Sequence, residues 1–189
     1  CLLGEEVRYN GGHVKDDFLV NTLGQYVQWV PVCPEVEMGM GVPRENVRLV
    51  GDAEDPRLVA PKSGTDHTDT MKKWAGQRLL ELEGMDLHGY ILKKDSPSCG
   101  LFRTKVYGGV AAPSRNGRGL FARELVNKFP MLPLEEEGRL RDPKLRENFI
   151  GRVFAYQRLL RLISNGPKAK NLIEFHASHK LSIMAHNPQ

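Results

Sequence analysis

Cysteine is scarce in this sequence, which has only three: Cys1, Cys33 and Cys99. An odd number at such low density excludes the dense disulfide framework of a small secreted domain. The absence of that framework favours a reducing compartment, so we predict a cytoplasmic protein. The three thiols are then free to serve as metal ligands, as a nucleophile or as core residues.

Long apolar runs are also missing. No stretch approaches the roughly 18–20 apolar residues of a membrane-spanning helix, so we expect no membrane partner. We find no signal peptide, internal repeat or low-complexity tract. A hydrophobic content of 40% and a charged content of 26% are typical of a globular protein.

Short apolar runs alternate with helical patterns through the first three quarters of the chain. Apolar and β-branched runs predict strands at residues 26–32, 48–50, 87–92 and 105–109. Apolar residues at helical spacing predict helices at 70–82 and 119–129, and two more after residue 144. We predict a layered, Rossmann-like α/β domain with a mostly parallel sheet at residues 1–143, its first strand cut short at Cys1. The start of an all-α helical domain, truncated at residue 189, follows at residues 144–189.

Positive charge is concentrated at the end of the chain. Residues 1–138 hold 17 Lys and Arg against 20 Asp and Glu, whereas residues 139–189 hold ten against three. Such a basic segment suits a polyanion, above all a nucleic acid, although a solvated helix surface is the plainer interpretation. The acidic run at residues 135–137 predicts a solvent-facing turn more than a metal site.

The cysteines occur in loops rather than inside regular elements. Cys33 and Cys99 each follow an apolar run and lie among glycines and prolines. In an open α/β sheet such loops meet at one edge, so we expect the three thiols to converge there. No histidine stands beside them to complete a zinc site, and a [4Fe–4S] cluster normally takes four thiolates, so three would leave one iron open. From spacing alone, three structural cysteines are an equally good interpretation.

Polar residues next to these cysteines could move protons. Glu35 lies two residues after Cys33, and Ser96 and Ser98 precede Cys99. A carboxylate beside a metal centre can act as a general acid or base, and a hydroxyl can relay a proton. The structural alternatives are a first-turn helix acid after Pro34 and an ordinary turn hydroxyl.

Five motifs span about residues 1–149: "CLLGEEVRYNGGH", "WVPVCPEVEMGMGVPRE", "GYILKKDSPSCG", "GLFA" and "FPMLPLEEEGRLRDPKLRENF". Together these motifs resemble those of the TudS-like thiouracil desulfidases. The tail, with "RVFAY" and "LIEFHASHKLSIMAHNP", looks like the helical domain fused to the two-domain tRNA 4-thiouridine desulfidases. The second match is partial, because the sequence stops where that domain should continue.

The resemblance implies a cofactor, a reaction and roles for residues. It implies a [4Fe–4S] cluster on Cys1, Cys33 and Cys99, whose free iron binds the substrate sulfur and which oxygen can destroy in an isolated sample. Glu35 and either Ser96 or Ser98 are the implied catalytic residues, with the choice of serine open. The implied reaction is a non-redox desulfuration of thiolated uridine in tRNA, with 4-thiouridine becoming uridine as hydrosulfide leaves.

Two alternatives stay open at this point. The same chemistry could act on free 2-thiouracil or another small thio-base, for which a basic helical tail would have no use. A different class of function, a non-catalytic RNA-binding or zinc-binding regulator, would use the same residues without catalysis. We expect tRNA to be the partner, held through the basic C-terminal helices.

Overall fold

The computed structural model describes residues 1–108 and 112–186 and contains two β-sheets. One is a four-stranded sheet with the order β2-β1-β4-β5, and the other pairs β3 with β6. The strands are β1 (Arg48–Gly51), β2 (Pro56–Val59), β3 (Tyr90–Leu92), β4 (Thr104–Tyr107), β5 (Ser114–Gly117) and β6 (Leu134–Glu136).

The α/β class is confirmed, but the sheets are mixed rather than mostly parallel. Strand β1 pairs in parallel with β4, and β3 with β6, whereas β1–β2 and β4–β5 are antiparallel. Only residues 52–55 join β1 to β2, and only residues 108–113 join β4 to β5. Such short connections enforce antiparallel pairing, because a parallel crossover needs about a dozen residues or more.

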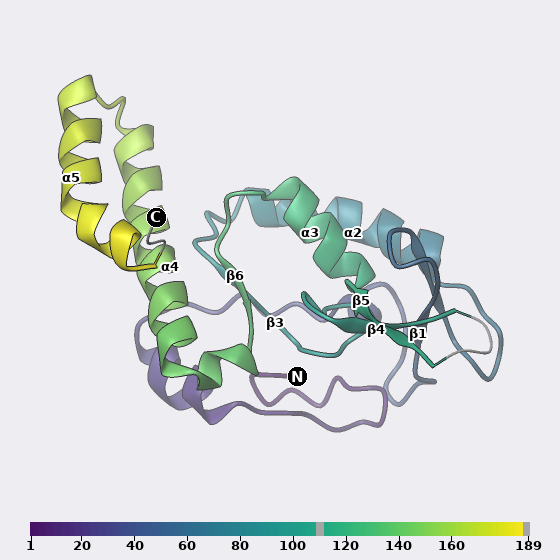
Figure 1. The fold of residues 1–189 in the computed structure, drawn as a ribbon. Helices are drawn as coiled ribbons and strands as arrows, with labels where there is room; N and C mark the ends of the chain where they lie inside the picture. The colour runs from purple at the N-terminus through teal and green to yellow at the C-terminus, as the bar shows by residue number, and fades with distance from the viewer. Residues whose placement is uncertain (109–111, 187–189) are drawn as a thin grey trace.

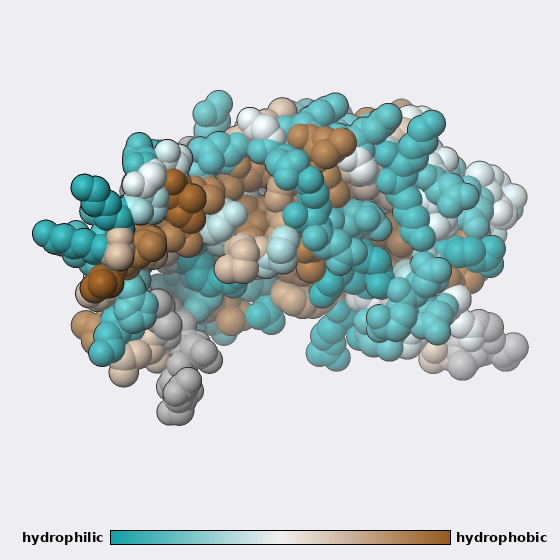
Figure 2. All heavy atoms as spheres, turned by 90° about the horizontal axis from the view of Figure 1, so that it is seen from above, coloured by the Kyte–Doolittle hydropathy of each residue, from teal (hydrophilic) through white to brown (hydrophobic). Residues whose placement is uncertain are grey.

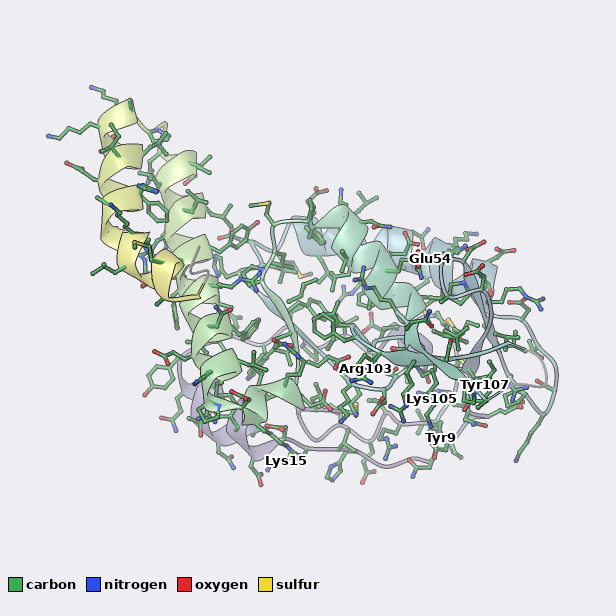
Figure 3. All side chains as sticks on the ribbon, in the orientation of Figure 1. Tyr9, Lys15, Glu54, Arg103, Lys105 and Tyr107 are labelled. Atoms are coloured by element: carbon green, nitrogen blue, oxygen red, sulfur yellow. The ribbon has the colours of Figure 1, made fainter. Side chains whose placement is uncertain are left out.

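Two helices cover one face of the four-stranded sheet (Figure 1). They are α2 (Thr68–Glu83) and α3 (Leu120–Lys128), which confirm the helices predicted at 70–82 and 119–129. Their apolar faces bury the inward-pointing residues of the strands in the main core, which includes Leu49, Leu58, Met71, Ala75, Val106, Phe121 and Leu125. Figure 3 places the labelled Lys105 and Tyr107 of β4 between α3 and the N-terminal segment that carries Tyr9 and Lys15.

The predicted strand at residues 26–32 is wrong, since this segment pairs with no strand in the described part of the chain. Its side chains still alternate between two apolar clusters. Val27 and Trp29 pack into a cluster around Leu19, while Val30 and Val32 pack against the main core. An extended backbone explains the alternation, and Pro31, which has no N–H, cannot donate to a sheet.

Short helical segments complete the body of the molecule. These are η1 (Phe18–Thr22), η2 (Leu23–Gln25), α1 (Pro34–Glu37) and η3 (Arg139–Arg141). The first residues, Cys1 to Gly4, form a turn closed by a hydrogen bond from the Gly4 N–H to the Cys1 carbonyl. The strand end expected there is therefore absent from the described residues.

Helices α4 (Pro143–Ser164) and α5 (Ala169–His186) form a hairpin that extends away from the body (Figure 1). The Asp142 side chain caps α4 by accepting the N–H groups of Lys144 and Leu145. The first half of α4 packs on the body through Phe149, which is buried with Leu19 and other residues of the second cluster. Figure 2 shows apolar surface at the end of the molecule formed by these two helices. No described helix has both the length and the apolar character to cross a bilayer.

Candidate active site

A cavity of about 550 Å³ is lined by all three cysteines. Cys1, Cys33 and Cys99 come from the first turn, the start of α1 and the loop after β3, and each is half-buried with a free thiol. They are therefore neither disulfide partners nor fully enclosed core residues. Apolar and aromatic side chains, including Trp29 and Tyr90, form much of the remaining lining.

Cys33 is held at the N-terminal end of α1. Pro34 takes the first helical position, where its missing N–H costs nothing. The Cys33 N–H donates to the Glu37 carboxylate at 2.8 Å, and Glu37 also pairs with Arg78 of α2 at 3.2 Å. The Cys33 thiol points to the Val7 carbonyl, with a sulfur–oxygen distance of 3.8 Å. These contacts anchor the backbone of Cys33 to the main helix of the body.

Cys99 lies in a loop that is shaped by Ser96. The Ser96 hydroxyl accepts the N–H groups of Ser98 at 3.2 Å and of Cys99 at 3.1 Å. The Gly100 N–H closes the same turn on the Ser96 carbonyl at 2.8 Å. Ser96 therefore holds the conformation of the loop by hydrogen bonds within it.

The same loop packs closely against the start of α3. The N–H groups of Gly119, Leu120 and Ala122 donate to the carbonyls of Gly100, Pro97 and Ser98, respectively, over 2.8–3.2 Å. A Cβ at Gly119 would lie 2.5 Å from the carbonyl carbon and oxygen of Ser98. Only glycine permits this approach, which explains physically why the "GLFA" segment begins with one.

The acidic run at residues 135–137 is buried, so its predicted exposure to solvent is wrong. The exposed fraction of these three glutamates is at most 9%. Glu136 accepts the N–H groups of Leu101 at 2.8 Å and Phe102 at 3.0 Å. Carboxylates can be buried here because they accept hydrogen bonds from backbone N–H groups of another segment. The sequence did not predict this contact.

Glu137 makes a matching contact at the other end of the cysteine loop. It accepts the N–H of Lys94 at 2.7 Å and the ammonium group of Lys93 at 2.9 Å. Glu136 and Glu137 thus hold the residues immediately after and before the segment 95–100. We call this pair the carboxylate clamp.

Glu35 forms a buried polar triad with Ser98 and Arg44. The Ser98 hydroxyl, fully buried, donates to Oε1 of Glu35 at 2.8 Å. The Arg44 guanidinium donates to Oε2 through Nε at 2.9 Å and Nη2 at 2.7 Å. Glu35 and Ser98 do not themselves line the cavity, but their neighbours Pro34 and Cys99 do. The triad therefore lies directly behind the cysteines.

No sequence pattern predicted the contact of Arg44 with Glu35. The Arg44 side chain is only 6% exposed, and Nη2 also donates to the Val7 carbonyl at 3.0 Å. Its backbone N–H donates to the Tyr9 carbonyl at 2.8 Å, which ties the loop after Cys1 to Glu35. The available signal was a lone arginine in the glycine- and proline-rich loop nine residues after Glu35.

The electrostatic surroundings make Cys99 a poor free nucleophile. Burial raises the pKa of the Cys99 thiol well above its usual range, and the nearby Glu35 carboxylate and Cys33 thiol raise it further. A thiol with a raised pKa stays protonated at neutral pH and reacts slowly. A bound metal centre reverses this balance, because its positive charge favours the thiolate.

Residues 1–137 match the family model described as 2-thiouracil desulfurase. The chain belongs to the 2-thiouracil desulfurase family. The chain is 32% identical over 105 residues to the uncharacterized protein YbbK of Bacillus subtilis. The matched region covers 53% of this chain and 69% of that protein.

A solved structure resembles this family member as well. It is the structure of the [4Fe-4S]-dependent thiouracil desulfidase TudS, with a TM-score of 0.59 and 29% sequence identity. The match covers 77% of this chain and 91% of that one. The chain is thus a homologue of a [4Fe-4S]-dependent thiouracil desulfidase.

The donor set of this desulfurase family member fits a cluster better than a single ion. Within residues 1–108 and 112–186, no three His, Cys, Asp or Glu side chains are placed to bind one metal ion. The three thiols instead surround one cavity. A cluster of several irons spans more space than one zinc ion, and soft thiolates are the ligands it uses.

Proposed function

We propose that this protein removes sulfur from thiolated uridine in tRNA, converting 4-thiouridine to uridine and releasing hydrosulfide. Cys1, Cys33 and Cys99 would hold a [4Fe–4S] cluster in which one iron has no protein ligand. The observation that carries the proposal is the meeting of these three cysteines, far apart in the sequence, around one cavity. The family match and the cofactor in the name of the solved relative support it.

The cluster, when bound, supplies a Lewis-acidic iron for a soft sulfur atom. Glu35, which lies behind the cavity wall, takes a proton from the attacking water by way of the Ser98 hydroxyl and returns it by the same route to the leaving sulfur. Ser98 hydrogen-bonds Glu35 at 2.8 Å and carries the proton between Glu35 and the Cys99 side of the cavity. The water oxygen bonds to the ring carbon and becomes the carbonyl oxygen. The carbon–sulfur bond breaks, and hydrosulfide leaves. No electrons enter or leave, so the reaction needs no redox partner.

Arg44 keeps Glu35 in position for this role. Its two donors hold Oε2, which leaves Oε1 for the Ser98 hydroxyl. These charge-assisted hydrogen bonds fix the orientation of the Glu35 carboxylate. Ser96, by contrast, is committed to two backbone N–H groups of its own loop. We therefore assign the catalytic serine as Ser98.

The basic helices support tRNA as the substrate. Exposed cations lie on α4, on α5 and in the loop between them, among them Arg152, Arg161, Lys168, Lys170 and Lys180. Cations of this kind contact phosphates and make binding dependent on salt. We propose that these helices hold the tRNA while its thiolated base enters the cavity.

One experiment tests the reaction. The protein is reconstituted anaerobically with iron and sulfide, and iron and acid-labile sulfide are counted per chain. It is then incubated with tRNA bearing 4-thiouridine. We expect the near-ultraviolet absorbance of the thio-base to fall while hydrosulfide appears in equal amount. A protein that carries its cluster and leaves the absorbance unchanged would rule out this substrate.

The tRNA contact has its own test. The affinity for tRNA is measured over a series of salt concentrations. We expect the logarithm of the binding constant to fall linearly with the logarithm of the salt concentration. Affinity that does not change with salt would exclude phosphate contacts by the basic helices.

Free thio-bases are the second candidate substrates. The cavity of about 550 Å³ is of the size of a small-molecule site, and the solved relative is named for thiouracil. Turnover of free 2-thiouracil at a rate equal to that of thiolated tRNA would favour this candidate. The zinc-binding regulator has no such support, because the described residues offer no single-ion site.

A further inference from the structure

Helix α4 lies beyond the part of the chain that matches the family model, yet it lines the cavity of the cysteines. The family match ends at residue 137, whereas α4 begins at Pro143. Five residues of α4 contribute to the lining: Phe149, Ile150, Val153, Phe154 and Gln157. Their spacing places them on one face of the helix. We call this face the α4 wall.

The α4 wall is packed tightly against the body of the protein. Phe149 is only 3% exposed. A Cβ at Gly89 would lie 2.6 Å from Cγ2 of Val153 and 3.5 Å from Cζ of Phe149. Gly89 directly precedes β3, whose first residue, Tyr90, also lines the cavity. The wall is therefore held close to the strand that leads to the loop of Cys99.

The chemistry of the α4 wall suits a planar heterocycle. Four of its five residues are apolar or aromatic, and Gln157 alone is polar. An aromatic side chain packs on the face of a flat ring. An amide offers both donors and an acceptor, which match the edge of a pyrimidine where an N–H stands beside a carbonyl or thiocarbonyl group. Phe154 and Gln157 follow the anchored residues along α4 and are only partly buried, so a ligand can reach them.

We propose that the α4 wall recognises the pyrimidine ring: Phe154 packs on its face, and Gln157 reads its hydrogen-bonding edge. Both are specificity-determining residues, and the inference rests on the proposed function for the identity of the ring. The helix thus couples the basic tail to the choice of base.

The test measures binding of rings that cannot be desulfurated, so that turnover does not interfere. Uracil and cytosine are titrated into the reconstituted protein by calorimetry. The two rings differ at the edge that Gln157 is inferred to read. The variants are Phe154→Ala and Gln157→Leu. Glu147→Gln is the matched control, since Glu147 is exposed on α4 and does not line the cavity.

The two variants are expected to behave differently. Phe154→Ala should weaken both rings by about tenfold and keep their ratio, because stacking does not depend on the edge. Gln157→Leu should reduce the preference for uracil over cytosine by about tenfold, the effect of one lost hydrogen-bonding group. The control should match the unmodified protein in both affinities. Circular dichroism checks that each variant is folded.

Two results would overturn the inference: both variants bind the rings as the unmodified protein does, or the unmodified protein binds neither ring. A failure of the proposed function looks different. In that case uracil binds in a manner that depends on Gln157, while neither 2-thiouracil nor thiolated tRNA releases hydrosulfide.

Discussion

The Ser98 hydroxyl donates a hydrogen bond to Oε1 of Glu35 at 2.8 Å, although the two residues are 63 positions apart in the sequence. Arg44 binds the other carboxylate oxygen, Oε2. A buried carboxylate with each oxygen assigned to a different partner has a fixed orientation. Its hydrogen bonds also determine which atom can exchange a proton. This relationship underlies the first three predictions.

Glu35→Gln should abolish most of the activity and leave the metal centre in place. The amide keeps the shape of the side chain but cannot accept a proton as a base, so we expect kcat to fall by about 10²–10⁴-fold. Iron content and the visible absorption of the cluster should stay at the level of the unmodified protein. Full activity in this variant would remove Glu35 from the mechanism.

Substitutions of the two serines should have different effects, one on activity and the other on stability. Ser98→Ala removes the hydroxyl that contacts Glu35, so kcat per bound iron should fall by at least about tenfold. Ser96→Ala removes the acceptor for two loop N–H groups, so it should lower the free energy of unfolding by about 1–3 kcal/mol. Activity per bound iron and chemical denaturation measure the two effects. The reverse pattern would make Ser96 the catalytic serine.

Arg44→Lys should lower kcat although the charge is kept. Lysine replaces the planar guanidinium group, which donates twice to Oε2, with a single mobile ammonium group. Glu35 then loses its fixed orientation, and we expect kcat to fall by about tenfold. In Arg44→Ala, added guanidinium ion should restore part of the activity. Arg57→Lys is the control, because Arg57 forms an exposed ion pair with Asp66 at 3.4 Å. Equal effects at positions 44 and 57 would contradict the positioning role.

Glu136→Ala should destabilise the fold and release the cysteine loop. It leaves the N–H groups of Leu101 and Phe102 without their acceptor, and the buried Leu101 donor alone costs about 1–3 kcal/mol. Glu83→Ala breaks only an exposed ion pair with Lys128, which contributes about 1 kcal/mol or less. Urea denaturation of both variants, with iron content after reconstitution, gives the comparison. A variant at position 136 no less stable than the one at 83 would disprove the carboxylate clamp.

Gly119→Ala should displace Ser98 and reduce both stability and activity. The added Cβ would overlap the Ser98 carbonyl, and overpacking of this kind costs about 1–3 kcal/mol. Gly76→Ala is the opposite control, because a Cβ at this exposed position of α2 meets no atom within 4 Å. It should stabilise the protein by about 0.4–1 kcal/mol by restricting the unfolded chain. Thermal melts and turnover rates decide between the two effects.

Local sequence patterns were a good guide wherever neighbouring residues determine the structure. The helical spacing around Met71 and Leu79 predicted α2. The first turn of helix that follows Cys33 was only the structural alternative for Glu35, and the structure contains it as α1. The short runs at 48–50 and 105–109 predicted β1 and β4, with residue 109 outside the described part of the chain. These features depend on residues within a few positions of one another, so their signal is present in the chain itself.

Contacts between distant segments account for what the patterns failed to predict. The carboxylate of Glu136 accepts the N–H of Leu101, which is 35 positions away in the sequence. This contact explains why the acidic run is buried although its composition predicted exposure to solvent. The run at 26–32 has the composition of a strand, but no partner lies beside it in the described structure. Residue spacing therefore predicted the helices and the loops that carry the cysteines, each as a separate segment of the chain. Only the folded structure shows that Ser98 and Arg44 contact Glu35, that the strand directions are mixed and that α4 lines the cavity, because each of these depends on where remote segments lie in space.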